Sequence, residues 1–167
     1  MTPPPEPGTA PGAVPEVPPA TDRDVFLTRV FAAPRAIVWR FFSDPALLGW
    51  FGPHGVHVDP ASVEIDLRPG GSWNLDMIDD LTGERYPMRA TLAAVTPPEY
   101  LEGRAEIPGG EAVTLRIWLH DHGDRTRLTL HQGPFSDQHR RMTAAGWEGS
   151  FEKIDAMLAE LESGSAR

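Results

Sequence analysis

Hydrophobic positions near the end of the chain recur at steps of three and four residues between Ser136 and Glu162. That spacing is the period of one face of an α-helix. Charged residues such as Glu148, Glu152 and Asp155 fall on the other side, so the sequence predicts a long amphipathic helix with one buried face. The buried stripe consists of Met142, Gly146, Trp147, Ser150, Phe151, Ile154, Leu158 and Leu161.

Two small residues in that stripe, Gly146 and Ser150, allow two interpretations. They either let the rest of the fold approach the helix closely, or they leave room beside Trp147 and Phe151. The first arrangement makes a solid protein and the second a hollow one. Before the helix, Gln132-Gly133-Pro134 is interpreted as a chain break.

The first structured part of the chain combines a strand with two short helices. Branched and aromatic residues dominate residues 25–31, as is typical of a β-strand. Pro34 opens a helix that Pro45 stops, because proline fits the first turn of a helix and not its interior. A second helical piece over residues 45–51 ends in Trp50-Phe51-Gly52-Pro53.

After a predicted loop at residues 54–60, apolar and polar residues mostly alternate. A period of two is that of a strand with one dry and one wet face. Turn signals such as Pro69-Gly70-Gly71 separate the alternating runs, which predicts six strands joined by hairpins. These strands cover residues 63–68, 73–77, 86–95, 101–107, 113–120 and 126–130.

The predicted order is one strand, two short helices, a six-stranded meander and one long helix. It indicates an α+β fold in which a curved, seven-stranded antiparallel sheet surrounds the C-terminal helix. One helix facing seven strands leaves a volume that either the chain's own side chains or a guest molecule must fill.

Composition divides the chain into one domain with short tails. Residues 1–22 are rich in proline and lack apolar periodicity, so we expect a disordered tail there, with a ligand for a proline-reading domain as the alternative. The domain is expected to cover residues 23–163, and residues 164–167 are expected to be a disordered C-terminus. No run of residues has the length and hydropathy of a signal or a membrane span, so we expect a cytoplasmic protein.

The charge balance and the absence of cysteine exclude several classes of function. The 167 residues carry a formal net charge of −9, with 24 acidic and 15 basic side chains, which disfavours nucleic acid as a partner. Without cysteine the chain has no disulfide, no thiolate metal site and no thiol nucleophile.

No residue set predicts catalysis, a metal or a cofactor. The sequence has no phosphate-binding glycine loop, no zinc-protease motif and no nucleophile elbow. Asp76 and Arg89 are interpreted as exposed strand charges. Four histidines lie in two loop pairs that lack a third ligand: His54, His57, His120 and His122.

Aromatic and aliphatic residues on the inner face of the sheet, the long helix and the 50–53 corner are the candidate ligand-binding set. For each of them, ordinary core packing is the alternative interpretation. Trp50 and Phe51 are expected near the cavity mouth. The set comprises Trp50, Phe51, Trp73, Leu75, Met77, Met88, Leu101, Leu115, Ile117, Met142, Trp147 and Phe151.

Several short motifs, in this order, resemble one known family. They include residues 27–31, the Trp50-Phe51-Gly52-Pro53 corner, Asp66-x-Arg68-Pro69-Gly70-Gly71 and Gly146-Trp147. Over about residues 24–161 the chain resembles the activator of heat-shock-protein-90 ATPase homologue-like (AHA1-type) family of the START-like/SRPBCC helix-grip superfamily. The resemblance implies a helix-grip fold.

The resemblance also implies a set of functions. The first is binding of a hydrophobic small molecule, such as a lipid or polyketide, between the sheet and the long helix. One alternative is a polyketide cyclase or dehydratase that uses the same cavity. Another is co-chaperone-like stimulation of a heat-shock ATPase, and a chaperone partner or a homodimer stays open.

Overall fold

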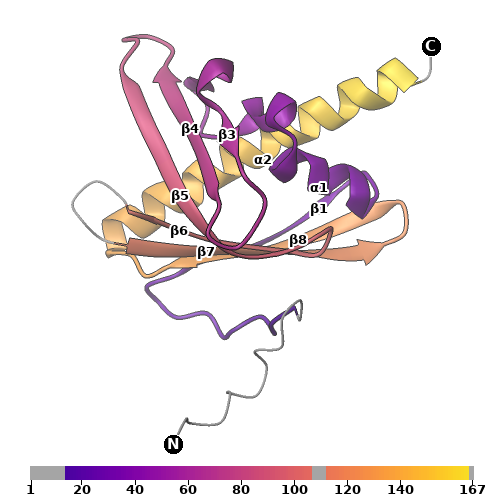
Figure 1. Ribbon diagram of the computed structural model, residues 1–167, viewed down its shortest axis with the longest axis horizontal. Helices are drawn as coiled ribbons and strands as arrows, with labels where there is room; N and C mark the ends of the chain where they lie inside the picture. The colour runs from indigo at the N-terminus through magenta and orange to yellow at the C-terminus, as the bar shows by residue number, and fades with distance from the viewer. Residues whose placement is uncertain (1–13, 107–111, 166–167) are drawn as a thin grey trace, which may run out of the picture.

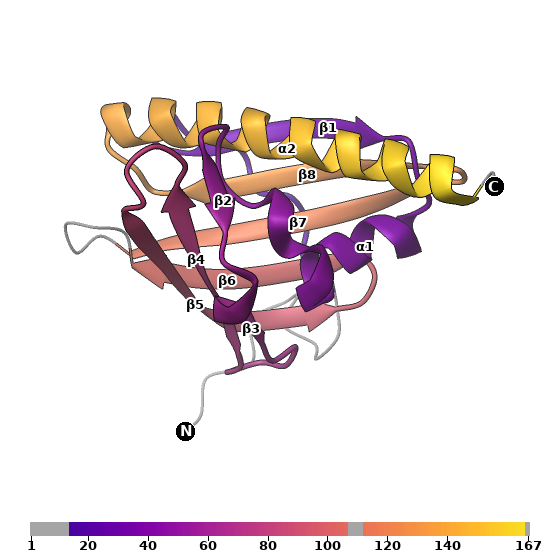
Figure 2. The same cartoon turned by 90° about the horizontal axis from the view of Figure 1, so that it is seen from above.

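The chain folds into one curved sheet with a long helix across its concave side (Figures 1 and 2). A computed structural model describes residues 14–106 and 112–165. The elements are β1 (Val25–Phe31), α1 (Arg35–Ser43), η1 (Pro45–Trp50), β2 (Val56–Val58), η2 (Pro60–Ser62), β3 (Glu64–Ile65), β4 (Ser72–Asp79), β5 (Arg85–Thr96), β6 (Tyr100–Glu106), β7 (Ala112–His122), β8 (Arg125–Gly133) and α2 (Asp137–Ser165).

Seven strands are hydrogen-bonded in series in the order β1-β8-β7-β6-β5-β4-β2, and every pair is antiparallel. The predicted helix-grip architecture is therefore confirmed. Two strand positions differ from the prediction. Val56–Val58, predicted as a loop, forms the last strand of the series, and the strand predicted at residues 63–68 shrinks to the two residues of β3, beside β4.

The short length of β3 follows from the turn after it. The N–H of Arg68 bonds back to the Asp66 carbonyl, and the N–H of Gly71 bonds to the Arg68 carbonyl. A Cβ on Gly71 would lie 2.1 Å from the Asp66 carbonyl oxygen. The chain therefore turns back at the glycine pair, and the alternation up to Arg68 overstates the strand.

Both predicted short helices are present, and Asp44 joins them. Its N–H closes α1 on the Arg40 carbonyl, while its side chain accepts the Ala46 N–H at 3.0 Å and begins η1. This second piece is a 3-10 helix with Pro45 at its start. A single cap residue thus ends one helix and begins the next, which fixes the position of the 50–53 corner.

The long helix α2 is held against β1, the edge strand at one end of the sheet. Ser136 caps it through its hydroxyl, which accepts the His139 N–H, and the helix runs to Ser165, past the predicted end. Arg29 of β1 forms ion pairs with Glu148 (3.3 Å) and Asp155, and its guanidinium lies 5.8 Å from the centre of the Phe151 ring. These contacts bind the first strand to the middle of α2.

A dense aromatic core fills the end of the molecule nearest α1 and η1. Its bulkiest members are almost inaccessible to solvent, and their burial removes large apolar areas from water. Trp50 and Trp73 each bury an indole ring. Trp50 donates its indole N–H to the Phe41 carbonyl of α1 at 2.7 Å, and Trp73 donates its own to the Phe42 carbonyl at 2.9 Å.

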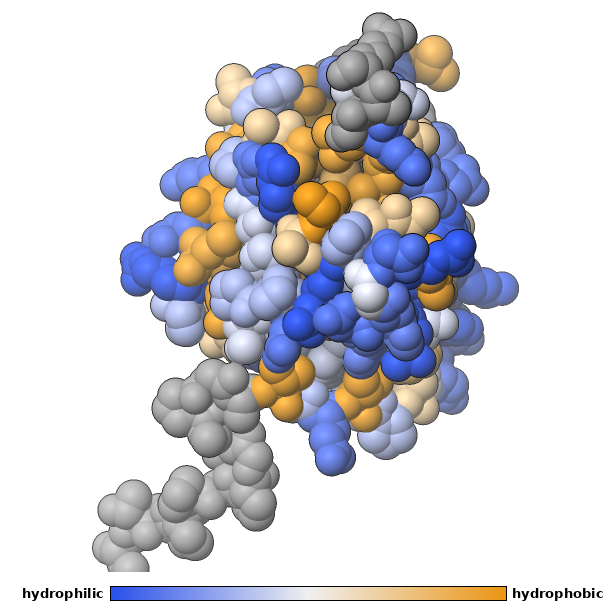
Figure 3. Space-filling view, turned by 90° about the vertical axis from the view of Figure 1, so that its right-hand side faces the viewer, coloured by the Kyte–Doolittle hydropathy of each residue, from blue (hydrophilic) through white to orange (hydrophobic). Residues whose placement is uncertain are grey.

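On the surface near the C-terminal end of α2, hydrophobic residues are interspersed among hydrophilic ones (Figure 3).

The segment before β1 lies against the convex side of the sheet, opposite α2 (Figure 1). Trp118 of β7 donates its indole N–H to the Pro15 carbonyl at 2.8 Å. The Trp118 ring also packs 5.2 Å from that of Tyr100, and both side chains are buried. Residues 1–13 and 166–167, part of the tails predicted to be disordered, lie outside the described residues.

Candidate ligand-binding cavity

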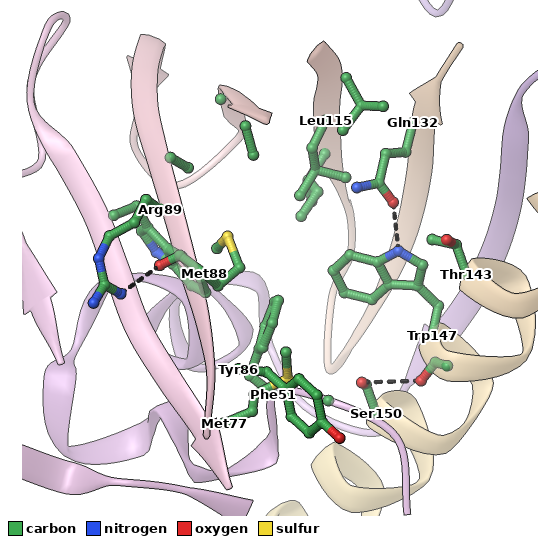
Figure 4. Close-up of a pocket in the computed structure, with 18 of the residues that line it drawn as sticks. Phe51, Met77, Tyr86, Met88, Arg89, Leu115, Gln132, Thr143, Trp147 and Ser150 are labelled. Atoms are coloured by element: carbon green, nitrogen blue, oxygen red, sulfur yellow. Dashed lines mark hydrogen bonds between the residues drawn. The ribbon is translucent and has the colours of Figure 1, made fainter. Parts of the chain in front are cut away.

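A cavity of about 520 Å³ lies between the concave face of the sheet and the first half of α2 (Figure 4). Its walls come from the 51–53 corner, strands β4 to β8 and successive turns of α2. Nine of the twelve candidate residues line it: Phe51, Trp73, Met77, Met88, Leu101, Leu115, Ile117, Met142 and Trp147. The hollow interpretation of the sequence therefore holds for this part of the fold.

Three candidates do not line the cavity. Trp50, Leu75 and Phe151 are at most 1% exposed and belong to the solid core. Trp50, expected near the mouth, instead turns its ring inward between Phe42 and Phe51. The reason is its indole N–H, whose bond to a carbonyl of α1 directs the ring toward that helix.

Phe151 follows Trp147 by one helical turn and reaches the region where the sheet and α2 close together. Its ring centre lies 5.7 Å from those of both Trp147 and Phe31. The stripe on α2 therefore borders a cavity near Trp147 and a packed core from Phe151 onward. Periodicity along the helix cannot distinguish these two halves, because the residues are of the same kind in both.

Glycines explain how α2 accommodates the cavity on one turn and a close contact on the next. Gly146 borders the cavity, and a Cβ added there would meet no atom within 4 Å. At Gly149 the same atom would lie 3.2 Å from the His54 backbone nitrogen. Three further small residues on the sheet, Ala90, Gly103 and Ala105, also line the cavity, and their short side chains leave space between the sheet and α2.

The corner after η1 is held against both the sheet and the helix. Gly52 has φ of +97°, and a Cβ there would lie 2.7 Å from Val56 and 2.8 Å from the sulfur of Met77. From the other side, the Lys153 ammonium donates to the carbonyls of Pro53 (2.9 Å) and Val56 (3.0 Å). Burial lowers the pKa of Lys153. Only glycine fits position 52, which explains the Trp-Phe-Gly-Pro pattern.

Gln132 is a polar lining residue in the segment that the sequence pattern indicated to be a chain break. It continues the inward-facing series Leu128 and Leu130 along β8, because side chains two apart share a strand face. Its carboxamide oxygen accepts the Trp147 indole N–H at 2.7 Å (Figure 4). Extending the alternation by one step beyond Leu130 would have found it.

The ionisable residues of the lining lie at its margins and face other partners. The Arg89 guanidinium donates to the carbonyls of Leu75 and Met88, both at 3.0 Å, and forms an ion pair with Asp76 at 2.8 Å. The Tyr86 hydroxyl donates to Glu84 at 2.9 Å. Glu106 and His139 are exposed. Across residues 14–106 and 112–164, no ion pair or hydrogen bond joins two ionisable lining residues, so no acid-base pair is assembled.

Asp76 was predicted to be an exposed strand charge, and its side chain is only 13% exposed. Two arginines cover it: hydrogen bonds from Arg89 and Arg85 hold the pKa of Asp76 below its usual value of 3.8. Arg85 also binds Asp59 at 2.9 Å and thereby links β5 to the loop after β2. This cluster stabilises the edge of the sheet beside the cavity.

Three of the four loop histidines form isolated pairs with other side chains. His54 contacts Glu152 at 2.7 Å, and His57 contacts Asp80 at 2.6 Å. His120 contacts Thr129 at 3.1 Å. In the described part of the chain, no three or more side chains of metal-binding type come together, and no helix is long and apolar enough to cross a membrane.

The family described as "Activator of Hsp90 ATPase homolog 1-like protein" matches residues 32–159, which include most of the chain, every strand except β1, and α2 as far as Ala159. The chain belongs to this family. The resemblance drawn from the short motifs is thereby confirmed. Membership supports a helix-grip type of ligand-binding fold and leaves the ligand, and any chaperone or enzymatic role, undefined.

Solved structures of other bacterial proteins share the fold. A protein from Nitrosomonas europaea is 24% identical, with a TM-score of 0.74 over 86% of this chain and 99% of its own. The AHSA1 protein from Silicibacter pomeroyi is 26% identical, with a TM-score of 0.70 over 81% of this chain and 97% of its own. CalU16 from Micromonospora echinospora is 22% identical, with a TM-score of 0.63 over 81% of this chain and 73% of its own. No curated protein matches the chain.

Proposed function

We propose that this family member binds a largely hydrophobic small molecule in the cavity between the sheet and α2. The single observation that carries the proposal is the cavity itself, about 520 Å³ and lined mostly by apolar side chains. Its size lies within the range of small-molecule sites, and at interior packing density it accommodates roughly 20 non-hydrogen atoms.

The small residues around the cavity support binding over simple packing. Gly146 in the middle of a helix costs about 1 kcal/mol relative to alanine, and open space beside it forfeits contacts that a larger side chain would make. A chain that needed only a stable core would place a larger residue there. The adaptable walls contributed by Met77, Met88 and Met142 suit an apolar guest.

Binding ranks above catalysis because of how the polar groups are placed. A cyclase or dehydratase needs at least one ionisable group that reaches the reacting atoms. The Arg89 guanidinium is held by Asp76 and by two carbonyls on its own side of the cavity, and Glu106 and His139 are exposed to water. The groups that reach inward in Figure 4, such as Gln132 and Ser150, do not titrate near neutral pH.

Native mass spectrometry of freshly purified protein, followed by a thermal-shift panel of lipids and neutral metabolites, tests this proposal. We expect a co-purified mass of a few hundred daltons, or stabilisation by apolar members of the panel, since a ligand that binds only the folded state raises its stability. A bare protein mass together with no shift for any compound would contradict the proposal.

A further inference from the structure

The hydrogen bond between Trp147 and Gln132 determines which end of the Gln132 amide faces the cavity. An indole N–H only donates, so its partner at 2.7 Å must be the carboxamide oxygen. The amide nitrogen therefore points the other way. Figure 4 shows it on the side away from Trp147, directed toward the open space.

Among the described residues, that nitrogen is a donor without an acceptor. Within residues 14–106 and 112–164, the bond to Trp147 is the one hydrogen bond that the Gln132 side chain makes. Most of the cavity lining is apolar, and in Figure 4 Leu115 lies on the side to which this nitrogen points. A donor in such surroundings gains most from a guest that brings an acceptor to it.

The orientation of the amide is also fixed from behind. The Trp147 ring is 6% exposed and packs within 6.2 Å of Trp50 and 5.9 Å of Phe51, measured between ring centres. Because the ring cannot turn without breaking these contacts, its N–H stays aimed at Gln132. The donor is therefore positioned before any guest arrives, and preorganised donors bind at lower entropic cost.

Among the described residues that line the cavity, no cation lies beside this donor. The positive lining group Arg89 lies on the other wall and is held by Asp76 and by carbonyls, while His139 is exposed (Figure 4). A carboxylate placed beside Gln132 would lose its hydration without gaining an opposite charge, which is costly. A neutral carbonyl in the same place loses much less hydration free energy.

We propose that the cavity selects apolar molecules that carry an uncharged hydrogen-bond acceptor, such as a ketone, ester or amide carbonyl, which the Gln132 amide nitrogen binds. The inference rests on the proposed function and adds the chemical class of the ligand. It makes Gln132 a specificity-determining residue and Trp147 the residue that positions it.

Three probes of equal chain length test the proposal by titration against intrinsic tryptophan fluorescence: methyl laurate, laurate and dodecane. One neutral hydrogen bond is worth roughly a tenfold change in affinity, so we expect the ester to bind about tenfold more tightly than dodecane and more tightly than laurate. Gln132→Met should remove most of the difference in affinity between the ester and dodecane. The matched control is Gln138→Met, which makes the same change at an exposed position of α2 outside the cavity.

A measurement on the unaltered protein covers the case in which Gln132→Met fails to fold. In nitrogen-15 spectra, methyl laurate should shift the side-chain amide signals of Gln132, and dodecane should shift them much less. Laurate binding as tightly as the ester, or a Gln132 signal that does not respond to the ester, would overturn the inference. If dodecane binds and the ester binds no more tightly than dodecane, only this inference fails. If none of the three probes binds, the proposed function is contradicted as well.

Discussion

Gly146 and Gly149 lie three residues apart on α2 and meet opposite surroundings. A Cβ on Gly146 would enter open space, and a Cβ on Gly149 would lie 3.2 Å from the backbone nitrogen of His54. The first glycine borders the cavity, and the second lets α2 approach the 53–54 loop. One stretch of helix thus serves both a hollow region and a close contact.

The two glycines should respond differently to alanine. Gly146→Ala adds helix propensity without a clash, so the free energy of unfolding should rise by about 1 kcal/mol. Gly149→Ala gains the same propensity but forces the loop to move, so its stability should fall below that of Gly146→Ala. Urea denaturation followed by circular dichroism measures both changes. Equal effects of the two substitutions would show that the two sites do not differ in space.

Arg29 should matter for the attachment of β1 to α2. Replacing it with methionine keeps the aliphatic stem and removes the ion pairs with Glu148 and Asp155 and the contact with the Phe151 ring. Because the carboxylates are partly exposed, we expect a loss of roughly 1 kcal/mol in unfolding free energy.

Salt distinguishes the charged part of that contribution. The difference in unfolding free energy between wild type and Arg29→Met should shrink as the salt concentration rises, since screening weakens exposed ion pairs. Denaturation curves recorded at low and high salt make the comparison. A difference that does not depend on salt would assign the effect to packing against Phe151 alone.

The covered carboxylate of Asp76 should make stability depend on acid pH. Hydrogen bonds from Arg89 and Arg85 lower the pKa of Asp76 in the folded protein below 3.8, its usual value. Above that value the carboxylate is charged in both states and its stabilisation is complete. As pH falls through 3.8 toward the folded pKa, the unfolded chain takes up the proton first and the stabilisation is lost.

Replacement of Asp76 with asparagine removes this titration. The variant should be less stable than the wild type near neutral pH, and its stability should fall less steeply between about pH 5 and pH 3. Thermal unfolding followed across that range is the measurement. Parallel pH profiles for the two proteins would mean that the arginines contribute nothing specific to Asp76.

The contact of Trp118 with the segment before β1 makes a further prediction. Trp118→Phe keeps an aromatic ring beside Tyr100 and removes the N–H that the Pro15 carbonyl accepts. The lost bond is worth about 1 kcal/mol, so that segment should detach roughly fivefold more often. Limited digestion at the exposed Glu16, by a protease that cleaves after glutamate, reports this as faster cleavage. An unchanged cleavage rate would show that the hydrogen bond does not hold the segment.

The sequence predicted the architecture because the two periodicities are long and unambiguous. Alternation gave the strands from β4 to β8, and the three-and-four spacing gave α2. β2 was not predicted because a strand of three residues is too short to show a period. β3 was predicted too long because Asp66 and Arg68 continue the alternation although they lie in a turn. Turn geometry at a glycine pair outweighed the pattern there.

The site was predictable only as a set of residue types. Apolar residues on the inner face line a cavity or fill a core according to how far apart the backbones lie, and a sequence does not report that distance. For this reason the sequence did not distinguish Trp50 and Phe151, which lie in the core, from Phe51 and Trp147, which border the cavity. Gln132 was missed because the glycine and proline after it were interpreted as the end of the strand pattern.

Titration of the apolar dye Nile red into two variants tests the binding cavity most directly. Gly146→Leu places a large side chain where α2 borders the cavity, and Ala145→Leu places the same side chain at the neighbouring exposed position. We expect wild type and Ala145→Leu to bind the dye with a blue-shifted emission, and Gly146→Leu, still folded by circular dichroism, to bind at least about tenfold more weakly. Equal binding by the two variants would contradict an apolar binding site beside Gly146.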